Sequence, residues 1–397
     1  MGLAQTVCQE LPDDEYPNKI YGVGGSAATP LISSIAREFA KLPGDQRVTI
    51  IWHDPGAGHA MHSLIGQEVD GVRTPAPVGT SGAVQQARYW DSNGNEHRCS
   101  VDTLSNPVLA DFGYMAAPPQ DINGYEDLDI ATFGIGAFVG PVSGWSLITH
   151  IDSNQNAISA EALYLVYGYA DNSGVAPWTQ KRWLFGRNYT SAALLAWVAA
   201  TGLPAESFQF HEDVQTNSAM VTAVANAEVP NASLGFVSTE VADRNRGQVK
   251  TLAFQAKGQT CAYYPDSTPT SFDKKNIRDG HYWNWAYHIF YAPVNGSGVP
   301  SNPLVARFFD AITGKTNPDV PHNLDLIIDE GTIPDCAMRV SRDPLGGYTP
   351  LASYAPEEPC GCYFDFVATG ESTCDECATT EDCSGDQVCR RGFCEEW

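Results

Sequence analysis

The sequence lacks long apolar runs and is poor in positive charge. No stretch approaches the ~18 apolar residues that a membrane-spanning helix needs, so we expect no direct membrane span. Among 397 residues, 23 Lys and Arg stand against 47 Asp and Glu, which gives a formal net charge of -24. Because such a surface repels the phosphates of nucleic acids, nucleic acid is excluded as a partner.

The short motifs of several enzyme classes are also missing. The chain contains no Gly-x-Ser-x-Gly, no His-Glu-x-x-His and no Gly-x-x-x-x-Gly-Lys-Ser/Thr sequence. These motifs place a nucleophile, a catalytic metal or a nucleotide phosphate. The sequence therefore predicts a protein that is not an enzyme and that uses no cofactor.

Cysteine, by contrast, is abundant and clustered. Of 11 cysteines, five lie between Cys374 and Cys394, and two more are Cys360 and Cys362. A short polar segment dense in cysteine predicts a disulfide framework, which persists only in oxidising compartments. Zinc binding is the alternative, because the first pair of the cluster has a Cys-x-x-Cys spacing that also suits a metal.

The disulfides predict a periplasmic, cell-surface or secreted location. Residues 1–17 lack the basic start and apolar core of a signal peptide, so a leader is presumed to have been removed. An odd cysteine total leaves at least one thiol unpaired. We expect Cys8, near the terminus, to be that thiol, and Cys99 to anchor a hairpin.

The composition divides the chain into three parts. Residues 1–17 are acidic and are expected to form an N-terminal leader segment ahead of the main domain, residues 18–355. Within this domain, residues 67–110 form an insert, in which the Asn93-Gly94 pair predicts a β-hairpin. Residues 356–397 are expected to be a Cys-rich C-terminal module, too short for a hydrophobic core of its own.

Strands and helices alternate along the main domain. A strand at Lys19–Val23, a Gly-rich turn and a helix at Leu31–Leu42 come first, with Thr29 expected to cap the helix. The other predicted elements are a strand at Val48–Trp52, a short helix at Met61–Ile65, helices capped by Ser159 and by Thr190, and a helix at Ser218–Ala227. This alternation predicts an α/β sheet with helices on both faces, in which ligands bind where strands lead into helices.

Five segments, in order, resemble the periplasmic phosphate-binding proteins of ABC-type importers. They are Ile20-Tyr-Gly-Val-Gly-Gly-Ser-Ala-Ala-Thr-Pro-Leu, Asp54-Pro-Gly-Ala-Gly-His, Ala110-Asp-Phe-Gly-Tyr-Met-Ala-Ala-Pro, Ile158-Ser-Ala-Glu-Ala-Leu-Tyr-Leu-Val-Tyr-Gly and Arg187-Asn-Tyr-Thr-Ser-Ala-Ala. Weaker likeness continues to Phe309, so the resemblance covers residues 18–330 in outline. The order and spacing of the segments carry it, because Gly-rich turns are individually common.

The resemblance implies a two-lobed periplasmic-binding-protein-like fold (type II), with a small anionic solute held in the cleft between the lobes. Backbone N–H groups at helix N-termini hold anions in such sites, even in an acidic protein. The ligand-binding residues that it implies are Gly25, Ser26, Ala27, Ala28, Gly56, Ala57, Gly58, Arg187 and Ser191. It also implies a bacterial source and an ABC importer, or another surface protein, as a partner.

The departures from this family bear on the ligand. The family's Ser-Asp falls on Ala116-Ala117, its second-loop Ser on Pro55, and the Gly-Thr of its Arg loop on Ala192-Ala193. Each replacement removes a hydrogen-bonding side chain, and a buried phosphate oxygen left without its donor costs about 1–3 kcal/mol. We therefore expect the fold to be retained and tight binding of free phosphate to be lost.

Other interpretations of the same residues remain open. A cell-surface or adhesion protein could keep this fold without the phosphate site. His53, Asp54, His59 and His62 lie within ten positions and are a candidate metal site, although each also suits a structural role. The aromatic run from His281 to Tyr291 is expected to be mostly core, with one face as a candidate lining for an organic ligand.

Overall fold

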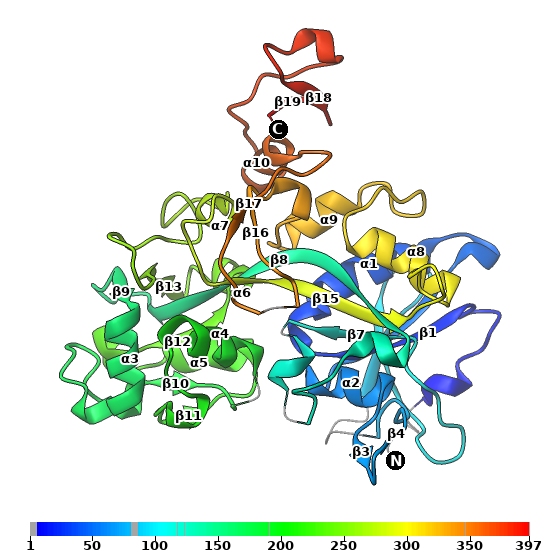
Figure 1. The fold of residues 1–397 in the computed structure, drawn as a ribbon, viewed down its shortest axis with the longest axis horizontal. Helices are drawn as coiled ribbons and strands as arrows, with labels where there is room; N and C mark the ends of the chain where they lie inside the picture. Colours follow the sequence, from blue (N-terminus) through cyan, green and yellow to red (C-terminus); the bar gives the residue numbers. More distant parts are fainter. Residues whose placement is uncertain are drawn as a thin grey trace. The chain divides into compact units, whose positions relative to one another are not determined.

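The chain forms two compact units. A computed structural model describes residues 6–80, 86–116, 118–122, 124–189, 191–345 and 347–396. Unit 1 comprises Met1–Pro141 and Tyr287–Glu330, and unit 2 comprises Val142–Ala286 and Gly331–Trp397. The chain therefore passes from one unit to the other three times. Two of these crossings lie inside the long strands β8 (Ile135–His150) and β15 (Trp285–Pro293) (Figure 1).

Unit 1 is built on three parallel strands. In addition to parts of β8 and β15, its elements are β1 (Lys19–Gly24), α1 (Thr29–Lys41), β2 (Thr49–His53), α2 (Gly58–Leu64), β3 (Glu68–Val69), β4 (Val72–Arg73), β5 (Gln86–Trp90), β6 (Glu96–Ser100), β7 (Phe112–Met115), α8 (Pro303–Ile312) and α9 (Asn323–Asp329). β1 pairs in parallel with both β2 and β7, and β15 pairs antiparallel with β7. The carboxyl ends of β1, β2 and β7 consequently meet at one edge of the sheet.

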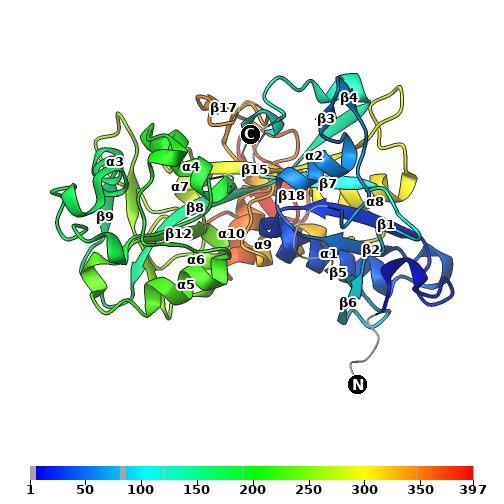
Figure 2. The ribbon, with the colours of Figure 1, turned by 90° about the horizontal axis from the view of Figure 1, so that it is seen from below.

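Helices cover both faces of these parallel strands (Figure 2). On one face, the ring of Phe112 in β7 contacts Phe308 of α8, which in turn contacts Phe39 of α1. On the other face, the Cα of Gly113 is directed at α2, because an added Cβ would lie 3.0 Å from Ala60. The α/β layering predicted from the alternation of strands and helices is therefore present.

The predicted hairpin in the insert is also present. β5 and β6 pair antiparallel, and the amide of Gly94 donates to the Asp91 carbonyl across the turn. Cys99 on β6 forms a disulfide with Cys8, with a Cα–Cα distance of 5.0 Å. The expectation that Cys8 carries the unpaired thiol is wrong, because residue 7 bridges to Ser100 and so brings the N-terminal segment beside β6. The free cysteine is the exposed Cys261.

Unit 2 is a second α/β layer. In addition to parts of β8 and β15, its elements are β9 (Ala157–Ser159), α3 (Ala160–Tyr169), β10 (Phe185–Gly186), α4 (Ala192–Thr201), β11 (Glu212–Asp213), α5 (Asn217–Ala225), β12 (Gly235–Ser238), α6 (Thr239–Arg244), β13 (Val249–Thr251), β14 (Ala253–Gln255), α7 (Lys275–Arg278), β16 (Val340–Ser341), β17 (Ala352–Ser353), α10 (Gly361–Thr369), β18 (Val388–Arg390) and β19 (Phe393–Glu395). β12 and β13 both pair antiparallel with β8.

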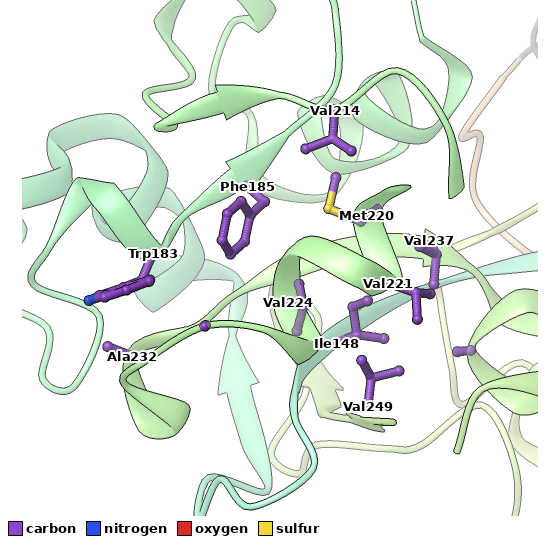
Figure 3. Close-up of a cluster of buried hydrophobic side chains, with 12 residues drawn as sticks. Ile148, Trp183, Phe185, Val214, Met220, Val221, Val224, Ala232, Val237 and Val249 are labelled. Atoms are coloured by element: carbon purple, nitrogen blue, oxygen red, sulfur yellow. The ribbon is translucent and has the colours of Figure 1, made fainter. Parts of the chain in front are cut away.

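A buried apolar cluster joins these strands to α5. Figure 3 shows Ile148 of β8, Val237 of β12 and Val249 of β13 gathered around Val221 and Val224 of α5. All five side chains are at most 3% exposed. Burial of each such side chain contributes about 1.5–3 kcal/mol, so this cluster fixes α5 and the loop that precedes it against the sheet.

The C-terminal segment is disulfide-linked and packs within unit 2. Its disulfides are Cys336–Cys360, Cys362–Cys374, Cys377–Cys389 and Cys383–Cys394. The disulfide framework predicted for this region is therefore present. Residues 356–397 belong to unit 2 by their contacts. That they form a separate module stays a prediction.

A buried carboxylate fixes the first turn of α10. Glu395, 2% exposed, accepts hydrogen bonds from the amides of Cys362 (2.9 Å) and Tyr363 (3.1 Å). These amides have no partner inside the helix because they belong to its first turn. Arg278 of α7 adds a second link, since its guanidinium donates to the carbonyl of Gly361 at 3.0 Å.

We predict that Glu395→Ala destabilises the C-terminal segment, whereas Glu396→Ala at the exposed neighbouring position does not. The first change leaves two buried amides without an acceptor, which costs about 1–3 kcal/mol. Urea denaturation under non-reducing conditions measures the difference. Equal free energies of unfolding for the two variants would contradict this account of how α10 is held.

A second prediction concerns the buried His288 in β15. Its ring stacks on Tyr114 at 5.3 Å, and neither ring nitrogen has a hydrogen-bond partner among the described residues. Burial lowers the pKa of His288 to about 4. The unfolded chain therefore binds this proton first, and stability falls by up to about 3 kcal/mol as pH drops from about 6.5 to 4.

His288→Phe should remove that part of the acid sensitivity. The matched control is His281→Phe, because His281 also stacks on a tyrosine, Tyr263 at 5.0 Å, but is exposed. Chemical denaturation at a series of pH values compares the three proteins. An unchanged pH slope in His288→Phe rules out His288 as the titrating group.

Candidate functional site

Two glycine-containing loops meet at the carboxyl ends of β1 and β2. The amide of Gly56 donates to the Gly24 carbonyl at 3.1 Å, and a Cβ added to Gly25 would lie 3.6 Å from that of Ala57. Each loop leads into a helix, β1 through the 3-10 turn Ser26–Ala28 into α1 and β2 into α2. The two loops that the resemblance assigns to the ligand are therefore neighbours within unit 1.

The start of α1 differs from the sequence prediction. Thr29 was expected to be the N-cap, but the helix begins at Thr29 with Ala28 at the cap position and no side-chain cap. The Thr29 hydroxyl instead donates to Asp54 at 2.9 Å and accepts from the indole of Trp52 at 2.9 Å. These contacts tie the first loop to the end of β2, and they leave the amides of the first turn of α1 without a side-chain acceptor.

Two histidines at the second loop, His53 and His59, are shielded from solvent. His53 is 1% exposed, and its Nδ1 lies 3.3 Å from the Gln86 carbonyl. Burial lowers its pKa. Burial also lowers the pKa of His59, and the nearby His53 and His62 lower it further.

These histidines do not form a compact metal-ligand group with Asp54. Within the described ranges, the one set of three or more donor atoms lying within 4.8 Å of one another is Cys377, Cys383 and Cys394. All three sulfurs of that set are in disulfides. Asp54 is instead engaged by Thr29 and by Arg88, whose guanidinium lies 3.4 Å away.

The segment that begins at Ala110, the third of the five that resemble the phosphate-binding proteins, has a residue in a structural role near its start. Asp111 accepts from the amide of Tyr21 at 2.8 Å and from the side chain of Asn302, the N-cap of α8, at 2.9 Å. Burial raises the pKa of this carboxyl. Ala116, which follows β7, carries no polar side chain, and Ala117 lies outside the described residues.

In unit 2, the predicted Arg187 and Ser191 lie just after β10 and just before α4. Ser191 is the N-cap residue of α4, and its hydroxyl makes no capping hydrogen bond. The sequence assigned this cap to Thr190, which lies outside the described residues. The predicted cap is therefore wrong by one position. Ser191 has the extended backbone of a cap residue, and its carbonyl accepts from the amides of Leu194 and Leu195.

The guanidinium of Arg187 is oriented by uncharged groups. Its Nη1 donates to the Asn217 side chain at 3.1 Å and its Nη2 to the Gln215 carbonyl at 2.9 Å. Its Nε is buried and has no partner among the described residues. Burial lowers the pKa of Arg187, and the nearby Asp213 opposes this shift. Since an arginine stays charged in proteins, this loop presents a cation that donates to the neutral acceptors Asn217 and Gln215.

Sequence reasoning missed the residues that hold Arg187. Asn217, at the start of α5, also donates to the hydroxyl of Ser238 at 3.4 Å, at the end of β12. Beyond it, the buried carboxyl of Glu240 accepts from Ser143 at 2.8 Å, and burial raises its pKa. A Ser or Asn at the end of a strand is the only sequence signal of this network, and it is too common to be selective.

The aromatic run is largely core. Tyr282, Trp285 and Tyr291 are 0% exposed. Trp283 and Trp285 instead enclose Arg342, whose guanidinium carbon lies 4.0 Å from the Trp285 ring centre and 5.3 Å from that of Trp283. An exposed aromatic side chain, Tyr189, follows Arg187 two positions later in the chain and is 49% exposed.

No protein-family model matches this sequence, and no curated protein matches it. In the described part of the chain, no helix has both the length and the apolar character required to cross a bilayer.

Solved structures are nevertheless similar. One is described as a phosphate ABC transporter substrate-binding protein with bound phosphate, from Clostridium perfringens: it is 12% identical, has a TM-score of 0.51, and the match covers 80% of this chain and 99% of that one. An ABC-type phosphate transport receptor from Vibrio cholerae is 15% identical with a TM-score of 0.48, over 79% and 99% of the two chains. A human phosphate binding apolipoprotein is 11% identical with a TM-score of 0.47, over 79% and 90%.

At this level of identity, the likeness to the Clostridium perfringens protein establishes the fold alone. The protein has the two-lobed, periplasmic-binding-protein-like α/β fold that its sequence predicts, with a disulfide-rich C-terminal region.

Proposed function

We propose that this protein is an extracytoplasmic solute-binding protein that holds a small anionic solute. The observation that carries the proposal is the state of Arg187. It is a half-buried cation whose hydrogen bonds to Asn217 and to the Gln215 carbonyl use neutral acceptors, and Asp213 acts on it only through space. Burying a charge is unfavourable unless it is paired, and an anionic solute supplies the missing partner.

The glycine loops of unit 1 support the same proposal. Gly25, Ser26, Ala27 and Ala28 precede the 13-residue helix α1, whose first turn has no side-chain cap. Gly56, Ala57 and Gly58 lie against them at the start of α2. The dipole of the 13-residue helix α1 favours an anion at its N-terminus. In the proposal, the loops of unit 1 and the loop of Arg187 and Ser191 in unit 2 each provide groups that favour an anion.

The location and partner belong to the proposal as well. Five disulfides require an oxidising compartment, which supports an exported protein. The Clostridium perfringens neighbour is described as a substrate-binding protein of an ABC transporter. A transporter of that class is the partner we propose, and binding without catalysis is the activity.

We predict that Arg187→Gln lowers the affinity for sulfate, used as a simple anion probe, by about tenfold or more, because a charged hydrogen bond contributes about 1.5–3 kcal/mol. Arg182→Gln is the matched control, since Arg182 is exposed and pairs with the exposed Glu228. Isothermal titration calorimetry measures both variants. Sulfate binding that is equally strong in wild type and Arg187→Gln overturns the assignment of this loop.

We also predict that free inorganic phosphate binds more weakly than a micromolar dissociation constant, which corresponds to about 8 kcal/mol. Pro55 removes one hydroxyl of the related sites, and the alanines at 116 and 193 remove further polar groups. A calorimetric titration with phosphate, after extensive dialysis against phosphate-free buffer, tests this. Tight binding would show that the loops were aligned wrongly with those of the phosphate-binding proteins.

A further inference from the structure

Asn284 is a buried amide side chain without a partner. It is 0% exposed, and neither its Oδ1 nor its Nδ2 has a hydrogen-bond partner among the described residues. An amide offers two donors and an acceptor. Leaving all of them buried and unpaired is unfavourable, so the residue calls for a partner that is not part of the described chain.

Two other buried asparagines of this protein have hydrogen-bond partners within the chain. Asn317, 3% exposed, donates to the Arg307 carbonyl and accepts from the amide of Asp319. Asn323, 2% exposed, donates to the carbonyls of Ala311 and Lys315. Among the buried asparagine side chains of the described residues, Asn284 differs in that neither of its polar atoms has a partner.

Asn284 has a second unpaired group beside it. Its carbonyl accepts from the amide of Trp145 at 2.9 Å, and the indole Nε1 of Trp145, which is 4% exposed, also has no partner among the described residues. Trp145 on β8 is in register with Ser238 on β12. Register partners in an antiparallel pair direct their side chains to the same face of the sheet.

These residues lead across unit 2 to the proposed anion site. Ser238 contacts Asn217, which orients Arg187. The residues at the ends of this row, Asn284 and Ser238, are two strand spacings apart, or about 10 Å. That separation exceeds the size of a bare oxyanion and matches the length of a small organic molecule.

We propose that the Asn284 amide and the Trp145 indole bind the solute at a distance from its anionic group. The inference rests on the proposed function and names the solute class: an organic anion that also carries a group able both to donate and to accept hydrogen bonds, such as a hydroxyl. An amide pairs fully with such a group, whereas a deprotonated oxyanion such as sulfate only accepts.

The test compares Asn284→Leu with wild type, using sulfate, glucose 6-phosphate and gluconate as probes in calorimetry. Wild type should bind at least one of the two hydroxylated probes more tightly than sulfate. Asn284→Leu should weaken that binding about tenfold or more and change sulfate binding less than about twofold, because a sugar hydroxyl would lose its partner. Trp145→Phe, which removes the N–H and keeps the ring, should weaken the same probe.

The stability of the unliganded variants separates a ligand role from a structural one. Asn284→Leu should melt no lower than wild type, because it removes polar atoms that have no partner. Asn323→Leu, the matched control in unit 1, should melt at a lower temperature and keep wild-type binding.

Three results would overturn the inference while leaving the proposed function intact. They are unchanged binding of the hydroxylated probe by Asn284→Leu, a melting temperature of that variant lowered as much as in Asn323→Leu, and sulfate binding in wild type as tight as that of both hydroxylated probes. If wild type binds none of the three probes, the proposed function fails, and this inference fails with it.

Discussion

The close approach of β1 to its neighbours is the constraint on which unit 1 depends. A Cβ at Gly22 would lie 2.1 Å from the ring of Phe112, and one at Gly24 would lie 2.5 Å from the carbonyl oxygen of Tyr114. Only residues without side chains allow β7 and β2 to pair on either side of β1 at these positions. The parallel register that follows brings the ends of the three strands together, and with them the two loops joined by Gly56 and Gly24.

Unit 2 positions its candidate ligand group by a different means. Arg187 follows a strand of two residues, so strand pairing alone does not fix its side chain. The direction of its side chain comes from Gln215, just before α5, and from Asn217, the first residue of α5. The apolar cluster around Val221 and Val224 holds α5 to the sheet. The hydrogen bonds of the cation thus depend on the packing of a helix some 30 residues later in the chain.

The glycine loops of unit 1 and the Arg187 loop of unit 2 share one electrostatic property, which is that both favour negative charge. The protein carries a formal net charge of -24, yet the groups proposed to favour an anion are a helix N-terminus in unit 1 and a cation with neutral donors in unit 2. Long-range repulsion of an anion is screened over about 8–10 Å at physiological salt. Local donors therefore decide whether an anion binds, and the acidic surface serves solubility.

Much of the fold could be predicted from the sequence. Gly-rich turns after apolar runs placed β1, β2 and the loops after them, the Asn93-Gly94 pair placed the β5–β6 hairpin, and the cysteine cluster placed the disulfide-rich end. These are local signals, since a strand, a turn and a helix start are each encoded within a few residues. Arg187 and Ser191 could be named because they lie in one short segment that resembles a known loop.

Partners that are distant in sequence could not be predicted. The pairing of Cys8 with Cys99 spans 91 residues, Thr29 bonds to Asp54 rather than capping its helix, and Arg187 is oriented by a residue 30 positions away. Asn284 and Trp145 resemble core residues in the sequence, and only the structure shows that their side chains have no hydrogen-bond partner among the described residues. Composition and periodicity determined which elements form. Only the tertiary structure decided which polar groups are satisfied by the chain and which remain for a ligand, because a hydrogen bond depends on the positions of both of its partners.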